Sequence, residues 1–151
     1  MAQLITFLTF NDQAEAAANH YVSIFDGKIA GVMPGPAGSV MGVNFEILGK
    51  KLIALNGGPS FAFSAGISLF VEVDTQEEVD RYWTRLTENG GKEVQCGWLV
   101  DKFGVSWQIV PKLLGQLLGD RNRDKAGRAM QAMLKMKKLD IASLQRAFEG
   151  A

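Results

Sequence analysis

The sequence predicts an α+β fold: two βαβββ modules that form a curved, cupped mixed sheet, followed by a helical C-terminal extension. Two observations carry the prediction. A strand–helix–strand pattern occurs twice with a constant offset of 63 residues, and the charge changes sign after residue 120. The chain has 151 residues, 47% of them hydrophobic and 21% charged, which is typical of a globular domain with its own core.

The first module begins with a run of aromatic and β-branched residues at 4–10, as expected of a buried strand. Asp12 and Glu15 have the spacing of a capping box, and Gly27 has the place of a helix stop. Between them, apolar residues recur at helical spacing. Strands are expected at 28–33, 40–48 and 51–56, with a hairpin turn at Gly49 and Lys50.

The second module repeats this order. A strand is expected at 67–73, and Thr75 and Glu78 have the spacing of a second capping box. The apolar face of the next helix has i, i+3, i+4, i+7 spacing, and strands are expected at 92–95, 98–101 and 105–110. The helix face consists of Val79, Tyr82, Trp83 and Leu86. With the 63-residue offset the two capping boxes coincide, which indicates a duplicated unit.

We therefore expect one domain over residues 1–118, with modules at about 1–60 and 61–118, and a basic helical tail over 119–151. Residues 1–120 carry 8 basic and 13 acidic side chains, whereas residues 121–151 carry 8 basic and 3 acidic ones. A stripe of Ala126, Met130, Met133 and Leu134 indicates an amphipathic helix. Because body and tail have opposite charge, we expect the tail to pack on its own chain or on a partner chain.

Composition excludes several classes of protein. One cysteine excludes an internal disulfide framework, and one histidine excludes a site that needs two imidazoles. Sixteen basic and sixteen acidic side chains cancel, so we expect neither a nucleic-acid nor a membrane partner. The N-terminus lacks the basic segment of a secretory signal, so a cytoplasmic location is expected.

Three segments carry a resemblance to a known family. They are Ala-Leu-Asn-Gly-Gly-Pro at 54–59, Gln-Cys-Gly-Trp-Leu at 95–99 and Asp-Lys-Phe-Gly-Val-Ser-Trp-Gln-Ile at 101–109. The chain resembles the PhnB-like group of the vicinal oxygen chelate superfamily, which includes glyoxalase I, extradiol dioxygenases and bleomycin resistance proteins. This group also carries the label 3-demethylubiquinone 3-methyltransferase-like. The resemblance implies the glyoxalase-like fold and a homodimer.

The resemblance also implies where a divalent metal would lie, because the superfamily holds one with four residues on four strands, typically His or Glu. In this chain those places are taken by Ile5 (or Thr6), Asn56, Ser68 and Gln108. None is a carboxylate, an imidazole or a thiolate, the side chains that such ions prefer. We expect no metal and no other cofactor. The methyltransferase label finds no support either, because no Gly-rich turn links a strand to a helix.

Strand alternation selects the candidate ligand-binding residues, which would line an apolar cleft with a few polar groups. They are Phe7, Thr9, Asn56, Ser68, Phe70, Trp98, Ser106 and Gln108. Several have a structural alternative: Ser68 and Gln108 can satisfy each other, and Trp98 can be a core residue. Glu72 is the candidate catalytic base, with a simple ion pair as the alternative.

Three functions are compatible with this pattern. The first is metal-independent binding of a small apolar or aromatic molecule. The second is an enzyme of lyase, isomerase or dioxygenase type with a degenerate site. The third is a structural or regulatory dimer whose core is filled by its own side chains.

Overall fold

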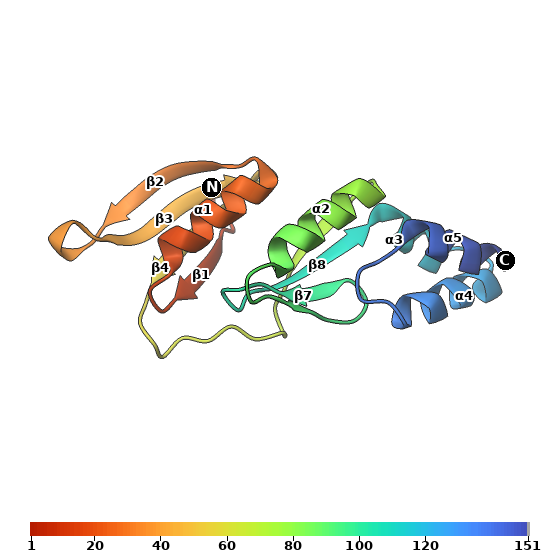
Figure 1. Cartoon of the computed structure of the whole chain (residues 1–151). Helices are drawn as coiled ribbons and strands as arrows, with labels where there is room; N and C mark the ends of the chain where they lie inside the picture. Colours follow the sequence, from red (N-terminus) through yellow and green to blue (C-terminus); the bar gives the residue numbers. More distant parts are fainter. Residues whose placement is uncertain (151) are drawn as a thin grey trace. The chain divides into compact units, whose positions relative to one another are not determined.

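The computed structural model describes residues 1–150, which fall into two units. The first unit spans Met1–Ala62, and the second begins at Phe63 and includes the rest of the described chain. Figure 1 shows the elements of each unit along the chain. Each unit is described by itself.

The first unit is a four-stranded sheet covered on one face by a helix. Its elements are β1 (Thr6–Phe10), α1 (Ala14–Phe25), β2 (Lys28–Pro34), a short 3-10 turn (Pro36–Gly38), β3 (Val40–Ile47) and β4 (Lys50–Asn56). The strand order is β1-β4-β3-β2, with β1 parallel to β4 and the other pairs antiparallel. α1 buries Tyr21, Ile24 and Phe25 on the side of the sheet that carries Leu8, Val43 and Phe45.

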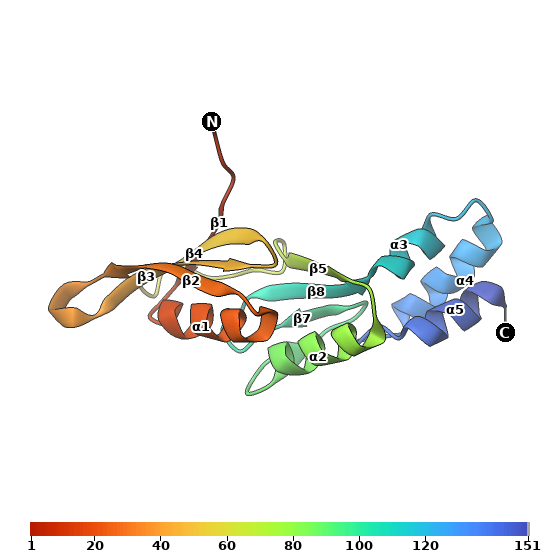
Figure 2. The same cartoon turned by 90° about the horizontal axis from the view of Figure 1, so that it is seen from above.

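The second unit repeats this topology. Its elements are β5 (Leu69–Val73), α2 (Gln76–Thr87), β6 (Lys92–Glu93), β7 (Trp98–Val100) and β8 (Ser106–Pro111). The strand order is β5-β8-β7-β6, and β5 runs parallel to β8. All four predicted core residues of α2 are buried. In Figure 2, α1 and α2 each lie along one face of their own sheet. The predicted pair of βαβββ modules is confirmed.

The predicted capping box at Asp12 is wrong. Helix α1 begins after Gln13, whose side chain makes no capping bond, and Asp12 is exposed. The first free amide of the helix, Ala14 N, instead donates to Oδ1 of Asn56 at 2.8 Å. The box at Thr75 is present: Glu78 N donates to Thr75 Oγ1 at 3.2 Å, and Thr75 N donates to Glu78 Oε1 at 3.1 Å. A side chain from β4 therefore replaces the local cap in the first unit.

Strand and turn boundaries differ from the prediction in three places. The β3–β4 turn consists of Leu48 and Gly49, both with positive φ, rather than Gly49 and Lys50. This is the conformation that a two-residue hairpin turn requires. The strand expected at 67–73 begins only at Leu69, and the strand expected at 92–95 ends at Glu93. Ile67 is 81% exposed, so no packing extends β5 backwards.

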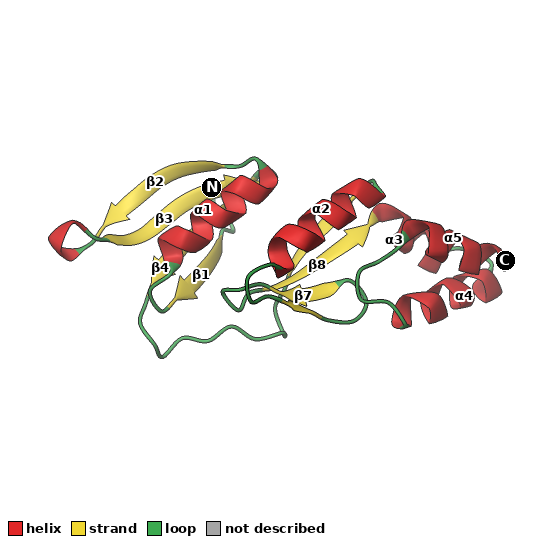
Figure 3. Ribbon diagram, in the orientation of Figure 1, coloured by secondary structure: helices red, strands yellow, loops and turns green. Residues whose placement is uncertain are grey.

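Three helices follow β8: α3 (Lys112–Leu118), α4 (Arg123–Leu134) and α5 (Ile141–Glu149), drawn in red near the C-terminus in Figure 3. They enclose a small core of their own. Its buried members are Val110, Leu114, Leu117, Ala129, Leu139, Leu144 and Phe148. The predicted apolar stripe of α4 is only partly right, because Ala126 is buried and Met133 half-buried, whereas Met130 and Leu134 are exposed.

Hydrogen bonds tie the segment between α4 and α5 to the α2 and β7 part of the same unit. Gln76 Nε2 donates to the carbonyl of Leu139 at 3.0 Å, and Ile141 N donates to Gln76 Oε1 at 2.8 Å. The amides of Cys96 and Gly97 donate to the carbonyls of Met136 and Lys137, each at 2.8 Å. The segment between α4 and α5 is thus bonded to both α2 and the turn before β7. Within residues 1–150, no helix has the length and apolar character needed to cross a membrane.

Candidate functional site

The helix-free face of each sheet carries most of the candidate residues. In β5, Val71 and Val73 are buried, whereas Phe70 and Glu72 are exposed on the opposite face. Register places Phe70 beside Gln108 of β8, and Gln108 beside Trp98 of β7. Side chains in register on adjacent strands share a face and are close neighbours. An amide therefore lies between two aromatic side chains across three strands of this sheet.

Ser68 and Gln108 are joined on this face, because Gln108 Nε2 donates to Ser68 Oγ at 2.9 Å. Both side chains are half-buried. Ser106 is buried next to Val100, its register partner in β7. Glu72 is an exposed register neighbour of Val110.

Asp101 is a buried carboxylate that is not among the predicted site residues. It is 2% exposed, and its Oδ1 accepts from Phe103 N at 2.8 Å and Val105 N at 3.0 Å. Its Oδ2 accepts from Trp107 Nε1 at 2.9 Å. These bonds close the β7–β8 turn and fix the start of the strand that carries Gln108. The turn sequence Asp-Lys-Phe-Gly was a signal for this role, because Asp commonly bonds backbone amides two residues on.

In the first unit, Phe7 and Thr9 lie on the helix-free face. Phe7 is 52% exposed and has Ile53 as its register partner, and Thr9 has Leu55. Thr9 also borders Gly57, where a Cβ atom would lie 2.5 Å from the Thr9 methyl and 2.9 Å from the Phe61 ring. Thr9 and Phe61 therefore leave room only for glycine at 57.

Asn56 has a structural task. Besides capping α1, its Nδ2 donates to the carbonyl of Val40 at 3.2 Å. One carboxamide thus joins the ends of β4, α1 and β3.

A cavity of about 240 Å³ lies on the first sheet, lined by Ile5, Ala30, Asn44, Phe45, Glu46, Lys51, Leu52 and Ile53. Asn44 shares the row of Phe7 and Ile53, because Asn44 is the register partner of Ile53. Asn44 is not among the residues predicted from strand alternation. Its signal was a polar residue between Val43 and Phe45, which are both buried toward α1.

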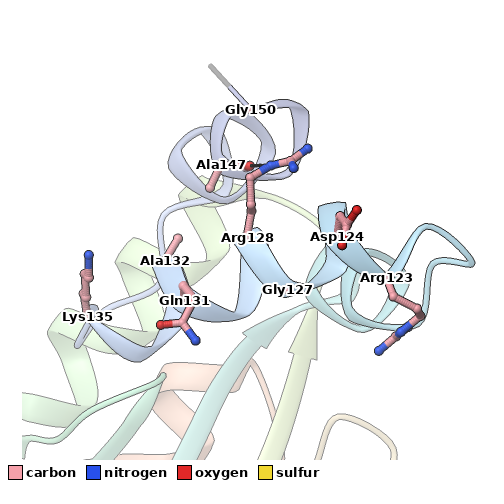
Figure 4. A pocket seen from close by; sticks show the side chains of 9 residues that line it. All are labelled: Arg123, Asp124, Gly127, Arg128, Gln131, Ala132, Lys135, Ala147 and Gly150. Carbon is pink, nitrogen blue, oxygen red and sulfur yellow. Dashed lines mark hydrogen bonds between the residues drawn. The ribbon is translucent and has the colours of Figure 1, made fainter.

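A second, open groove of about 640 Å³ lies between α4 and the end of α5 (Figure 4). Arg128 crosses the groove to α5, where its Nε and Nη2 donate to the carbonyls of Ala147 and Phe148 at 3.1 and 2.9 Å. Arg123 Nη1 donates to the carbonyls of Leu118 and Asp120. Both arginines thus satisfy carbonyl groups near the ends of α5 and α3.

The side chains at the four expected metal positions do not fit a divalent metal. Asn56 uses its amide oxygen to cap a helix, and Gln108 uses an N–H on Ser68. Ile5 offers no donor. No group of three or more His, Cys, Asp or Glu side chains with metal-binding geometry is found within residues 1–150. The donor set therefore lacks the charged or imidazole ligands that such ions prefer.

Comparison with known proteins places this fold in a family. Residues 2–110 match the family described as 3-demethylubiquinone-9 3-methyltransferase. A PhnB protein from Bacillus cereus is 29% identical, with a TM-score of 0.67 over 73% of this chain and 99% of its own. No curated protein matches the chain.

More distant structures share the fold. A glyoxalase/bleomycin resistance protein from Albidiferax ferrireducens is 14% identical, with a TM-score of 0.52 over 73% of this chain and 98% of its own. A fosfomycin resistance protein from Listeria monocytogenes, solved with Mn(II) and sulfate, is 16% identical, with a TM-score of 0.51. That alignment covers 72% of this chain and 89% of the other.

Proposed function

The chain belongs to the PhnB-like, 3-demethylubiquinone-9 3-methyltransferase-like family within the glyoxalase and bleomycin resistance superfamily, and on that premise we propose that it binds a small aromatic molecule without a metal. The single observation that carries the proposal is the row of Phe70, Gln108 and Trp98 on the helix-free face of the second sheet. Aromatic side chains around a polar amide are a common composition for a small-molecule site.

Hydrogen-bonding capacity supports this use of the row. The bond to Ser68 uses one of the two N–H groups of Gln108. The Gln108 carbonyl oxygen and the Ser68 hydroxyl proton then serve as one acceptor and one donor toward a ligand. A neutral aromatic compound with its own hydroxyl or amide group satisfies both. Phe70, which is 55% exposed, offers a ring face to stack on the ligand.

The metal-free part of the proposal rests on donor chemistry. Uncharged side chains take the four places where the superfamily typically has His or Glu, and two of them, Asn56 and Gln108, already form hydrogen bonds within the protein. Binding then depends on stacking and hydrogen bonds instead of coordination. The homodimer implied by the resemblance stays a prediction.

The test uses protein labelled with 5-fluorotryptophan, titrated with indole, 2-naphthol and 1-naphthylacetamide and observed by ¹⁹F NMR. The Trp98 resonance, assigned with Trp98→Phe, should shift and saturate with at least one compound. Phe70→Ala should weaken that binding about tenfold, because one stacked ring contributes on the order of 1 kcal/mol. Ile67→Ala is the matched control, since it removes another exposed apolar side chain just before β5. A Trp98 signal that responds to none of the three compounds contradicts the proposal.

A further inference from the structure

We infer that the first sheet binds the carboxylate of a small organic acid in the cavity beside Asn44. The inference rests on the proposed function, because it takes the helix-free faces of the sheets to be ligand surfaces. The cavity holds about 240 Å³. Sites for drug-sized molecules have roughly 300–1,000 Å³, so this cavity suits one end group of a ligand.

Backbone geometry creates the space. The pairing of β2 with β3 shifts register between Ile29 and Gly31, so Ala30 is the extra residue of a β-bulge. Opposite Asn44 stands Gly31, where an added Cβ atom would meet only Asn44 Nδ2, at 3.6 Å. The bulge and the missing side chain leave the Asn44 amide beside open space. Such irregularities often mark a functional place on a sheet.

The charges around the cavity leave one cation without a partner. Glu46 is the register partner of both Lys28 on β2 and Lys51 on β4. Its Oε2 lies 3.1 Å from Lys28 Nζ, which forms an ion pair. Lys51 lines the cavity and has no ion pair within residues 1–150. The ammonium groups of Lys28 and Lys51 and the carboxylate of Glu46 together carry a net charge of +1. The carboxylate of one ligand molecule neutralises this charge.

Asn44 supplies the hydrogen bonds. Its side chain is half-buried in an otherwise apolar row with Phe7 and Ile53, and it makes no hydrogen bond within residues 1–150. The amide atoms of Asn44 are not among the fully buried ones, so a ligand oxygen that enters the cavity can accept from Nδ2. Ile5 and Ile53 add apolar walls. An acid with an apolar body therefore has an amide donor and an ammonium group for its head, and Ile53 and Phe7 for its body.

The test compares two probes of nearly equal shape, 1-naphthylacetate and 1-naphthylacetamide, by NMR of the Asn44 side-chain NH₂ and the Ile53 methyl groups. The acid should shift both signals and saturate, and added salt should weaken it. Lys51→Met keeps the aliphatic stem and should weaken the acid about tenfold. Lys50→Met, the adjacent exposed lysine on β4, should change nothing. Asn44→Leu should weaken the acid similarly, and unchanged thermal midpoints show that the variants fold.

Two results overturn the inference: equal binding of acid and amide with no effect of Lys51→Met, or an acid that never shifts the Asn44 and Ile53 signals. The Trp98 resonance, read in the same samples, reports on the proposed function separately. If 1-naphthylacetamide shifts the Trp98 resonance while neither probe shifts the Asn44 signal, the carboxylate site at Asn44 is contradicted and the proposed function is supported. A silent Trp98 for every aromatic probe removes the second-sheet site, whatever happens at Asn44.

Discussion

The two units have the same strand order but hold their helices with different hydrogen bonds. In the first, Asn56 from β4 caps α1 across 42 residues of sequence. In the second, Thr75 and Glu78 form a local box at the start of α2. Because α2 caps itself, the adjacent Gln76 is free to bond Leu139 and Ile141 of the C-terminal segment. The corresponding residue in the first unit, Gln13, makes no capping bond and is exposed.

The apolar pattern thus sets the topology of a duplicated unit, whereas its helix can be capped either by a local capping box or by a side chain from a distant strand. Asp80, which holds Lys138 at 2.8 Å, corresponds to buried Ala17 in the first unit. The second module thus binds the C-terminal helices through Gln76 and Asp80 of α2, and within residues 1–150 the first module has no equivalent contacts at Gln13 and Ala17. The following predictions test this contrast from the largest expected effect to the smallest.

Replacement of Asp101 should have the largest effect. Asp101→Ala removes the acceptor of three donors in a buried turn, so the free energy of unfolding should fall by about 3 kcal/mol in urea denaturation. Asp101→Asn keeps one acceptor and should cost less. Asp12→Ala, an exposed acid without a capping bond, is the control and should stay within about 0.5 kcal/mol of the wild type. A loss below about 1 kcal/mol for Asp101→Ala contradicts the role assigned to this turn.

Asn56→Ala should reduce stability by about 1.5 kcal/mol, because it removes the cap of α1 and the bond to Val40 together. Hydrogen exchange should locate the loss in the first turn of α1. If stability is unchanged while binding of a ligand is lost, Asn56 belongs to the ligand site and the capping account is wrong.

Thr75→Ala should cost about 1 kcal/mol by the same measurement, since it removes one half of a capping box. Thr75→Ser retains the hydroxyl oxygen and should restore most of the stability. Faster exchange in α2 with no change in α1 is the expected pattern. Equal effects on both helices contradict the separate capping of the two units.

The Asp80–Lys138 pair should give the smallest effect. The hydrogen bond from Lys138, followed by that from Gln76, lowers the pKa of Asp80 below its usual 3.8. Its stabilising contribution is therefore complete above about pH 4 and is lost as the pH falls through the folded-state pKa. Because both side chains are about half exposed, Asp80→Asn should cost no more than about 0.5 kcal/mol at pH 6. The difference from the wild type should shrink as the pH falls below that lowered pKa, and a difference that grows on acidification contradicts this account.

The sequence predicted the parts of the fold that depend on apolar periodicity. The buried face of α2 follows from its apolar spacing alone, and all four predicted residues, Val79, Tyr82, Trp83 and Leu86, are buried. The cap of α1 was missed, because a bond between Asn56 and Ala14 joins distant residues and leaves no local pattern. Strand ends were misplaced where burial stops, as at Ile67.

The candidate residues were predictable from alternation, but their hydrogen bonds were not. Periodicity put Ser68, Phe70 and Gln108 on one face of the second sheet. Periodicity did not identify Asn44 as a site residue, because the bulge at Ala30 and the space beside Gly31 depend on how β2 pairs with β3. Asp101 was recognisable only as part of a motif, because its three hydrogen bonds depend on how the β7–β8 turn folds.

The most direct test of the central claim is the titration of Trp98 with 1-naphthylacetamide in protein stripped of metal by EDTA and then dialysed free of it. We predict the same saturable ¹⁹F shift and the same midpoint with or without added Mn(II), Ni(II) or Zn(II), and loss of affinity in Phe70→Ala. Binding that vanishes after stripping and returns with one stoichiometric ion contradicts the claim that neutral side chains do the binding.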